Sequence, residues 1–503
     1  MAAAGAADRR CIMSLGWIDA AEAVKRYRRA HSRLPASSTF VLSLFAGLLG
    51  TAGCAPSSIA PSRVNGPRSE LVAPGVALAT FDSVWTMVHR SYVDTAFVSS
   101  KWDSVRDSLR PRALAVNTRD GLDQLLSATL ANIPDSHFYI IPARVASEVG
   151  SPDDNGGPRG TGGTTGVAVR IAERRLLVWR VAPGSPAALA GITAGETVDR
   201  IGDRDAGVAV NRVLSLKDAA RDRAASELLR TLNAALSPGV GDVVRIRVRN
   251  RDRGGTREHT LRAVPTKGTV SKFGNLPPIA GDVRAARRAT RRPDGSGKHK
   301  CVGTIAFNIW LPALAAELER AVDSVSGCAG IIIDLRGNPG GVGAMVMGFG
   351  GYFVDSALVL GTMRTRDVSL KFAINPRFAR ASGVRSPLFA GPVAILVDPL
   401  TGSTSEIFAA GMQRLGRMRV FGERSAGAAL PALMEKLPSG DVFVHAIADF
   451  TDPEGRRIEG TGVVPDETVL LTEKDLRHEV DAPFEAAVRW IEATAAARTE
   501  LRK

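Results

Sequence analysis

The chain has 503 residues, of which 45% are hydrophobic and 23% are charged, with a mean hydropathy of +0.02. This composition excludes a disordered, collagen-like or polytopic membrane protein, and the length predicts about three domains of roughly 150 residues each. The net charge of +14 would ordinarily indicate nucleic acid as a partner. Ten of these charges, however, lie in two segments, residues 1–54 (net +4) and 271–301 (net +6). Since neither forms a basic face over a domain and 271–301 lacks interleaved aromatics, we expect no nucleic-acid binding.

The first 54 residues have the order of a secretory leader. Basic residues ending at Arg33 precede an apolar run at 39–50, which is too short to span a bilayer, and then small residues and Cys54. This ending resembles a bacterial lipoprotein signal, in which Cys54 would be the lipidated first residue, although Thr51 stands where that signal usually has Leu. We expect an exported, periplasmic or cell-envelope lipoprotein of a bacterium. Secretion without lipid, an uncleaved signal anchor and a downstream start at Met13 remain alternatives.

Export would give the remaining cysteines a meaning, because disulfides persist outside the cytosol. Cys301 and Cys328 each precede a strand-like apolar run, and a helix-like segment at 311–322 joins the two runs. If the strands are parallel neighbours in a βαβ unit, their starts could lie within disulfide reach. Two buried free thiols are the alternative.

A Pro/Ser/Gly-rich tether at 55–74 leads into a segment with helical periodicity. Within 75–150, apolar residues recur at spacings of three and four, which predicts a helical cap domain. The repeating residues are Phe81, Val84, Trp85, Val88 and Tyr92, then Leu122, Leu125, Leu126 and Leu130. The segment ends in Asp135-Ser136-His137, and a Gly-rich stretch at 155–163 marks a boundary.

Residues 160–270 change to short alternating strands. The run Pro183-Gly-Ser-Pro-Ala, followed by Ala-Gly-Ile and Gly-Glu at fixed offsets, resembles a PDZ domain. Such domains add a peptide strand to a sheet edge and hold its terminal carboxylate on backbone amides. Here those amides would come from Thr165, Gly166, Val167 and Ala168. We expect a helical insertion at 211–236 to pack into the core of this domain. We expect the basic segment 271–300 to be a solvated linker or flap between domains.

The last region, 301–495, has strand–helix–strand order and two glycine-rich turns. The first turn, Asp334 to Gly341, follows a buried strand but lacks the Gly-Lys-Ser/Thr of a phosphate loop. The second follows the apolar strand 393–397 and carries Ser403 and Ser405 before a helix. A nucleophilic serine favours this position, since a sharp turn exposes its hydroxyl at a helix N-terminus. An ordinary helix N-cap is the alternative.

Together these motifs resemble the C-terminal processing (tail-specific) peptidases and their tricorn-core relatives. The resemblance covers about residues 78–495 and also rests on Gly422-Glu-Arg-Ser-Ala-Gly427 and on Ile458 to Asp466. It implies an α/β catalytic core with ClpP/crotonase-like βαβ layers, an N-terminal helical cap and an inserted β-rich PDZ domain. It also assigns Ser403 as the nucleophile and leaves Ser405 as a cap.

The chain departs from the processing-peptidase pattern at one position that matters for mechanism. Where that branch places a lysine general base, this sequence has Ala428. Tricorn-like members use a histidine preceded by a serine, with a glutamate near a Gly-Val-x-Pro-Asp motif, and these residue types stand here at His137, Ser136 and Glu459. The resemblance places the oxyanion hole on the amides of Gly340 and Thr404. Lys436 and His445 are the alternative bases.

The residue chemistry agrees with this assignment. A serine hydroxyl is a poor nucleophile near neutral pH, so a histidine with a pKa near ~6.5 suits proton removal and return. No cluster has metal-ligand spacing, so we expect neither metal nor cofactor. The sequence thus predicts an exported serine endopeptidase acting on polypeptides, with PDZ recognition of C-termini. A catalytically inactive PDZ-bearing adaptor is the alternative.

Overall fold

The computed structural model describes residues 70–143, 162–250, 254–272, 274, 278–290, 300–385 and 387–500, together with the short strand β1 (Leu44–Phe45). Apart from β1, which falls within the expected leader, the leader, its lipidation residue Cys54 and most of the tether lie outside the described residues. Within the described part, no helix is both long and apolar enough to cross a membrane.

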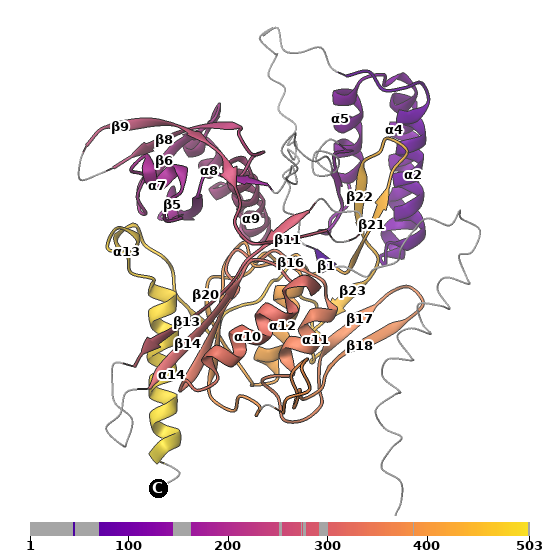
Figure 1. The fold of residues 1–503 in the computed structure, drawn as a ribbon. Coiled ribbons are helices and arrows are strands. Elements are labelled where there is room, and N and C mark those ends of the chain that lie inside the picture. Colours follow the sequence, from indigo (N-terminus) through magenta and orange to yellow (C-terminus); the bar gives the residue numbers. More distant parts are fainter. Residues whose placement is uncertain are drawn as a thin grey trace, which may run out of the picture. The chain divides into compact units, whose positions relative to one another are not determined.

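The segment after the tether is helical, as its periodicity predicts. Phe81, Val84, Val88 and Tyr92 are fully buried and pack with the leucines of the later helix. Figure 1 shows α2, α4 and α5 in indigo and purple. The elements are α2 (Val76–Ser91), α3 (Thr95–Phe97), the π-helical turn Val98–Trp102, α4 (Asp103–Ala115) and α5 (Arg119–Leu130).

This helical segment joins the C-terminal half of the chain through a strand. β2 (Tyr139–Ile141) pairs antiparallel with β22 (Val442–Ala446), which in turn pairs with β21 (Ala432–Lys436). Because β2 begins two residues after His137, this pairing fixes the end of the turn that carries the histidine.

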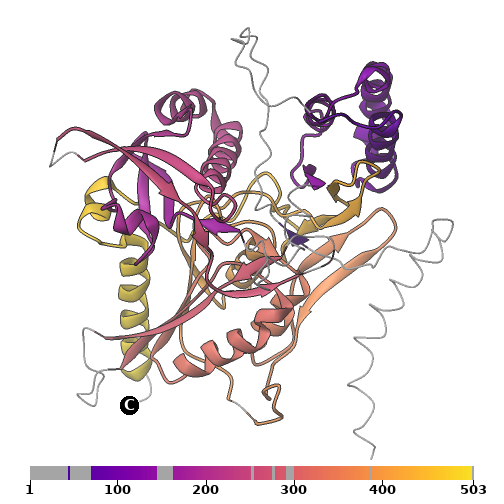
Figure 2. The ribbon, with the colours of Figure 1, turned by 45° about the horizontal axis from the view of Figure 1, so that its top comes forward.

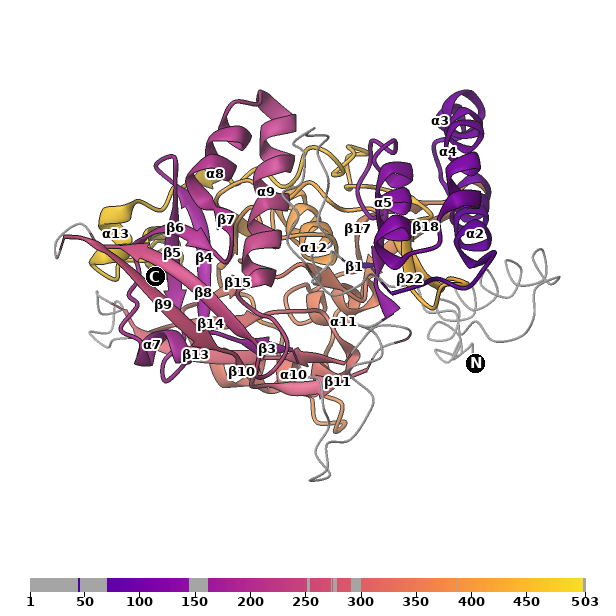
Figure 3. The same ribbon diagram turned by 90° about the horizontal axis from the view of Figure 1, so that it is seen from above.

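Residues 163–265 form a twisted antiparallel sheet in the order β4-β5-β6-β8-β9 with two longer helices. Leu229, Leu232 and Leu236 of the expected insertion belong to its buried core. Figure 3 shows α8 and α9 beside this sheet. The elements are β3 (Gly163–Thr164), β4 (Val167–Ala172), β5 (Arg175–Val181), α7 (Pro186–Leu189), β6 (Thr197–Ile201), β7 (Arg204–Asp205), α8 (Ala206–Leu214), α9 (Asp218–Ala235), β8 (Val243–Arg249), β9 (Thr256–Arg262) and β10 (Val264–Pro265).

The expected linker at 271–300 is wrong for its described part, which is mostly strand. β11 (Thr269–Ser271) pairs with β12 (Ile279–Gly281), and β13 (Val283–Ala289) pairs antiparallel with β14 (Cys301–Phe307). β13 is an edge strand whose side chains are largely exposed, so its arginines interrupt the apolar alternation that marks a strand in sequence. Charged side chains at a sheet edge also oppose pairing with other chains.

The C-terminal half is built on a six-stranded sheet in the order β13-β14-β15-β19-β20-β24. From β14 onward the strands are parallel, and β15 (Gly330–Asp334) and β19 (Val393–Val397) are entirely buried. One face, with Val302, Ile332 and Ala394, packs against α14 (Ala482–Glu500). Figures 1 and 2 show α14 on one side of the sheet and α10 (Ala315–Val325) and α12 (Thr404–Arg414) on the other.

The remaining elements extend this core. β16 is a two-residue strand that pairs antiparallel with β1, and β18-β17-β23 form a smaller antiparallel sheet. The elements are the 3₁₀ turn Pro312–Leu314, β16 (Gly340–Gly341), α11 (Ala344–Gly350), β17 (Leu358–Arg364), β18 (Ser369–Ile374), β20 (Arg419–Gly422), β23 (Asp449–Thr451), β24 (Glu467–Thr468) and α13 (Glu473–Arg477).

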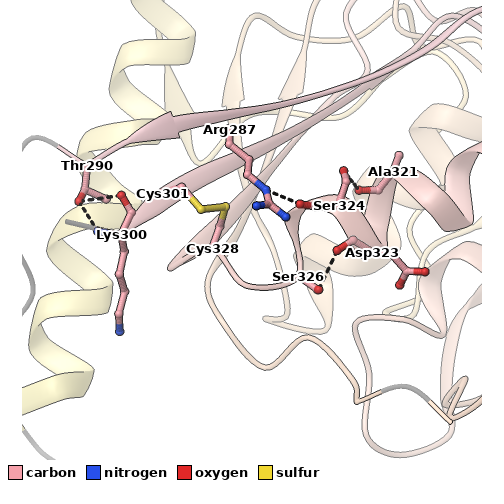
Figure 4. The surroundings of a disulfide bond; sticks show 9 residues. All are labelled: Arg287, Thr290, Lys300, Cys301, Ala321, Asp323, Ser324, Ser326 and Cys328. Carbon is pink, nitrogen blue, oxygen red and sulfur yellow. Dashed lines mark hydrogen bonds between the residues drawn. A yellow bond between two sulfur atoms is a disulfide. The ribbon is translucent and has the colours of Figure 1, made fainter. Parts of the chain in front are cut away.

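Cys301 and Cys328 form a disulfide across the βαβ unit, with their Cα atoms 4.6 Å apart. Cys301 opens β14, and Cys328 precedes β15, the parallel neighbour of β14. Figure 4 shows the bond beside Arg287 of β13, whose guanidinium donates to the carbonyl of Ser324 at the end of α10. The starts of the two strands thus lie within disulfide reach.

Candidate active site

Ser403 stands in the turn between β19 and α12, where it is fully buried. Its backbone has φ 52° and ψ −121°, a conformation that non-glycine residues rarely adopt and that concentrates at functional sites. Its N–H donates to the carbonyl of Ala428 (2.8 Å) and to Oε2 of Glu406 (3.0 Å). The structure therefore holds this serine in a strained turn at the positive end of the α12 dipole.

Gly340 and Thr404 lie next to Ser403. A Cβ built on Gly340 would come within 2.6 Å of Cβ of Ser403 and 3.0 Å of the amide nitrogen of Thr404, so only glycine fits here. The backbone of Gly340 also has φ 110°, which favours glycine. Its N–H donates to Oδ1 of Asn338 (3.0 Å), so an incoming carbonyl oxygen must share or displace this acceptor.

His137, Ser136 and Glu459 form a hydrogen-bonded chain. Nδ1 of His137 lies 2.7 Å from Oγ of Ser136, and that hydroxyl donates to Oε2 of Glu459 (2.9 Å). The backbone N–H of Ser136 donates to Oε1 of the same carboxylate (2.7 Å). The adjacent Ser136 and His137 are thus brought together with Glu459, which lies 323 residues further along the chain.

The direction of these bonds assigns the histidine tautomer. An ionised carboxylate only accepts hydrogen bonds, so the hydroxyl of Ser136 donates its single O–H to Glu459. Its oxygen must then accept from Nδ1–H of His137, which leaves Nε2 with a lone pair. A general base needs this tautomer. Burial raises the pKa of Glu459, while hydrogen bonds from Ser136 and Ala429 favour its ionised form.

Asp135, the first residue of the histidine turn, is held by two side chains. Tyr92 donates to its Oδ2 (2.8 Å), and Arg457 bonds to both carboxylate oxygens (3.2 and 2.7 Å). Arg457 also pairs with Asp449 (2.9 Å). Such bidentate pairing fixes orientation as well as distance, so the turn of His137 is attached to both halves of the chain.

Oγ of Ser403 is buried and forms no hydrogen bond within the part of the chain that the structure describes. The bond from Ser403 to His137 is therefore not formed here, as is common before substrate is bound. The alternative bases are placed less well. Lys436 is exposed at the end of β21, and His445 uses its two ring nitrogens toward Ser91 and Glu435 (3.1 Å each).

Ser405 does not have the capping role that we expected. Its Oγ is fully buried and accepts from Nε1 of Trp310 (2.9 Å). The expectation failed because the partner lies 95 residues away in the chain, on a segment that only tertiary packing brings to α12.

The residues expected to hold a peptide carboxylate lie at the start of β4. The N–H groups of Thr165 and Gly166 already donate, to the carbonyl of Leu236 (3.1 Å) and to Oγ1 of Thr164 (3.0 Å). Val167 and Ala168 pair with β5 through Val181 and Arg180. At the edge of β4 that faces α9, the side-chain amide of Asn233 bonds to both N–H (2.9 Å) and C=O (3.2 Å) of Val169.

Sequence reasoning missed several residues that support the site, among them Glu406, Asn338 and Asp398. Glu406 carried a usable signal, because Ser403-x-x-Glu406 has the spacing of a helix capping box. Asp398 had none, since its buried partner, Arg170, lies in the β-rich segment.

Comparison with known proteins gives the same picture. Residues 302–469 match the sequence profile of peptidase family S41, and residues 79–131 match that of the tricorn protease C1 domain. A carboxyl-terminal-processing protease of Picosynechococcus is 25% identical over 393 residues, which cover 76% of this chain and 81% of that protein. A chloroplastic C-terminal processing peptidase of Tetradesmus obliquus is 25% identical over 404 residues, covering 77% and 76%.

Two solved structures share the fold. The photosystem II D1 C-terminal processing protease aligns with a TM-score of 0.52 and 20% identity, covering 84% of this chain and 98% of that one. Mature CPAF aligns with a TM-score of 0.54 and 14% identity, covering 84% and 96%. Residues 302–469 therefore carry a peptidase family S41 domain and residues 79–131 a tricorn protease C1 domain, and the chain is a serine-type peptidase.

Proposed function

We propose that this chain is an exported endopeptidase that cuts polypeptides with Ser403 as nucleophile and His137 as base. The observation that carries the proposal is the chain from Glu459 through Ser136 to His137, which leaves Nε2 of the histidine as a proton acceptor. Ala428 occupies the position of the family lysine, so the histidine is the base that the site offers.

The proposed reaction has two halves. Nε2 of His137 takes the hydroxyl proton of Ser403 as Oγ attacks the scissile carbonyl, and the oxyanion forms against the amides of Gly340 and Thr404. The imidazolium returns its proton to the leaving amine. A water, deprotonated in the same way, then hydrolyses the acyl-serine. Throughout, Ser136 and Glu459 hold the ring and stabilise its positive charge.

Substrate would enter as an extended strand. The short strand β16 contains Gly340 and is paired antiparallel with β1, which supports strand addition at the proposed oxyanion hole. We further propose that residues 160–270 act as a PDZ domain that recruits apolar C-termini at β4. This proposal is supported by β4 being an edge strand that has α9 beside it, the arrangement that this mode of recognition uses.

Export and lipid anchoring complete the proposal. They rest on the leader-like order of residues 1–54 with Cys54, and a disulfide between Cys301 and Cys328 agrees with a compartment outside the reducing cytosol.

The test is labelling of the purified protein with a fluorophosphonate probe, alongside cleavage of unfolded casein. We expect wild type to be labelled and active, and Ser403→Ala to lose both with an unchanged melting temperature. His137→Ala should lose cleavage, whereas Lys436→Ala should keep it. An active Ser403→Ala variant would show that Ser403 is not the nucleophile. An inactive Lys436→Ala together with an active His137→Ala would assign the base to Lys436 instead.

A further inference from the structure

Glu406 carries a fully buried carboxylate in the first turn of α12 that accepts four hydrogen bonds. Its Oε2 accepts from the N–H groups of Ser403 (3.0 Å) and Ala428 (2.9 Å). Its Oε1 accepts from Oγ of Ser425 (2.5 Å) and N–H of Gly427 (2.7 Å). Since all four partners are donors, the site suits a group that only accepts.

The segment Gly427–Ala429 lies between two buried carboxylates. Gly427 and Ala428 donate to Glu406, and the next amide, Ala429 N–H, donates to Oε2 of Glu459 (2.7 Å). These are consecutive backbone groups, so a shift of either carboxylate moves the same short stretch of chain. Ala428 is also the residue that stands in place of the family lysine.

This segment connects the nucleophile to the base. The carbonyl of Ala428 accepts from N–H of Ser403 (2.8 Å), and the Glu459 that holds Ala429 also holds Ser136, which bonds His137. An unbroken series of short contacts therefore runs from the backbone of the strained serine to the imidazole.

We propose that Glu406 is a positioning residue of the catalytic site, which together with Glu459 clamps residues 427–429 and so fixes the backbone of Ser403 relative to His137. This inference rests on the proposed function, because it assumes that Ser403 and His137 are the reacting groups. It adds a residue that would touch neither substrate nor reacting atoms but would set how far apart those atoms lie.

The Glu406 carboxylate is an acceptor whose charged form is destabilised by burial. Burial raises the pKa of Glu406 to about 7, against the opposing effect of Ser425, Gly427 and Ala428, and the nearby Glu459 adds to the rise. A neutral glutamine would avoid this cost, but it has one oxygen for three backbone N–H groups. At least one of these donors, such as Gly427 N–H, would then face an amino group, and a buried donor without an acceptor is destabilising.

The experiment compares Glu406→Gln with Glu196→Gln. Glu196 is a matched control because it is also buried and hydrogen-bonded, to Arg257 and Asn250, but lies outside the site. For each variant we would measure the melting temperature, the rate of fluorophosphonate labelling, and kcat and KM with a peptide substrate. Both variants should lose thermal stability.

For Glu406→Gln we expect the labelling rate and kcat to fall about 10- to 100-fold, with KM unchanged within about threefold. Glu196→Gln should keep the wild-type labelling rate at a temperature equally far below its own melting point. Ser425→Ala removes one donor to the carboxylate and also the acceptor of the Val463 N–H (2.6 Å), but it keeps the carboxylate itself. This milder variant should fold and label about three- to tenfold more slowly.

The outcomes separate the two proposals. If the wild-type protein is labelled and both Glu406→Gln and Ser425→Ala are labelled at the same rate, the positioning role alone would be overturned. The positioning role would also be overturned if the labelling rate and kcat of Glu406→Gln fell no further than those of Glu196→Gln. If the wild-type protein is labelled no more than Ser403→Ala, the probe does not react with this serine. That result would overturn the proposed function, and the positioning role with it.

Discussion

The guanidinium of Arg170 in β4 bonds to the carboxylate of Asp398, and both side chains are almost completely buried. Oδ1 of Asp398 accepts from the N–H groups of Gly337 (2.9 Å), Leu400 (3.0 Å) and Thr401 (3.0 Å). These belong to the turns that precede Gly340 and Ser403. One ion pair therefore ties the β-rich segment to both turns of the proposed active site.

Replacing Arg170 by methionine should lower both stability and kcat, because it leaves the Asp398 carboxylate buried without its cation. Loss of one partner of a buried pair typically costs about 3–5 kcal/mol. Urea unfolding and steady-state kinetics would measure the two effects. Arg247→Met, which breaks the exposed pair with Glu258, is the control and should change stability by less than about 1 kcal/mol. Wild-type kinetics in Arg170→Met would show that the two turns need no such tie.

Replacing Asn233 by alanine should increase the affinity of the β4 edge for a peptide C-terminus. The amide of Asn233 now bonds N–H and C=O of Val169, the groups that an added strand would use. The carbonyl of Val169 also accepts from Nη1 of Arg170 (3.0 Å), so the substitution frees the N–H of Val169 alone. Since a hydrogen bond contributes about 0.5–1.5 kcal/mol, removing this competitor should tighten binding about three- to tenfold.

Fluorescence anisotropy of a labelled hexapeptide ending in Leu-Ala-Val-Ala, on a Ser403→Ala background, would measure this affinity. Asn211→Ala, an exposed asparagine on α8, is the matched control, and the C-terminally amidated peptide tests the carboxylate. An affinity that is equal in wild type and Asn233→Ala would mean that peptides do not add at this edge.

Removing the disulfide should destabilise the catalytic half of the chain. Cys301 and Cys328 are 27 residues apart in sequence, and a loop of this length is stabilised by about 3 kcal/mol when it is closed. Cys301→Ala combined with Cys328→Ala should lower the urea midpoint by a corresponding amount, and dithiothreitol should lower only that of wild type. Equal midpoints with and without reductant would argue against the bond.

Stability should fall as pH rises from about 4.5 to about 7. Burial lifts the pKa of Glu406 from 4.5 to about 7, so in this window the folded protein binds a proton that the unfolded chain releases. The contribution is complete below the lower value and is lost as pH passes the higher one, and it amounts to about 3 kcal/mol.

Urea unfolding at pH 5 and pH 8 would measure this loss. Glu406→Gln has no proton to lose there, so it should be less sensitive to pH than wild type across the same window. Asp334 affects stability in a separate, more acidic pH range. Arg336 beside it lowers its pKa to about 2 despite burial, so its contribution disappears only as pH falls below the usual 3.8. Identical pH dependence in both proteins would contradict a pKa of Glu406 that burial raises to about 7.

Local patterns in the sequence determined a large part of this protein. Spacings of three and four predicted the buried faces of α2 and α5, and apolar runs predicted β14, β15 and β19, because burial on one face imposes these periods. The resemblance of the Ser403 and Asp-Ser-His motifs to those of a peptidase family indicated the proposed nucleophile and base. Sequence reasoning failed at β13, where exposed arginines on an edge strand hide the strand period.

Only the tertiary structure decided how these residues meet. Glu459 bonds to Ser136, and Arg170 bonds to Asp398, although the partners lie far apart in the chain. Trp310 donates to the hydroxyl of Ser405, which therefore does not cap the helix. No local pattern encodes such pairs, because a buried donor or acceptor takes whatever partner packing brings within hydrogen-bond distance. The sequence therefore indicated the proposed reacting groups, while tertiary packing determined which carboxylates and amides hold them.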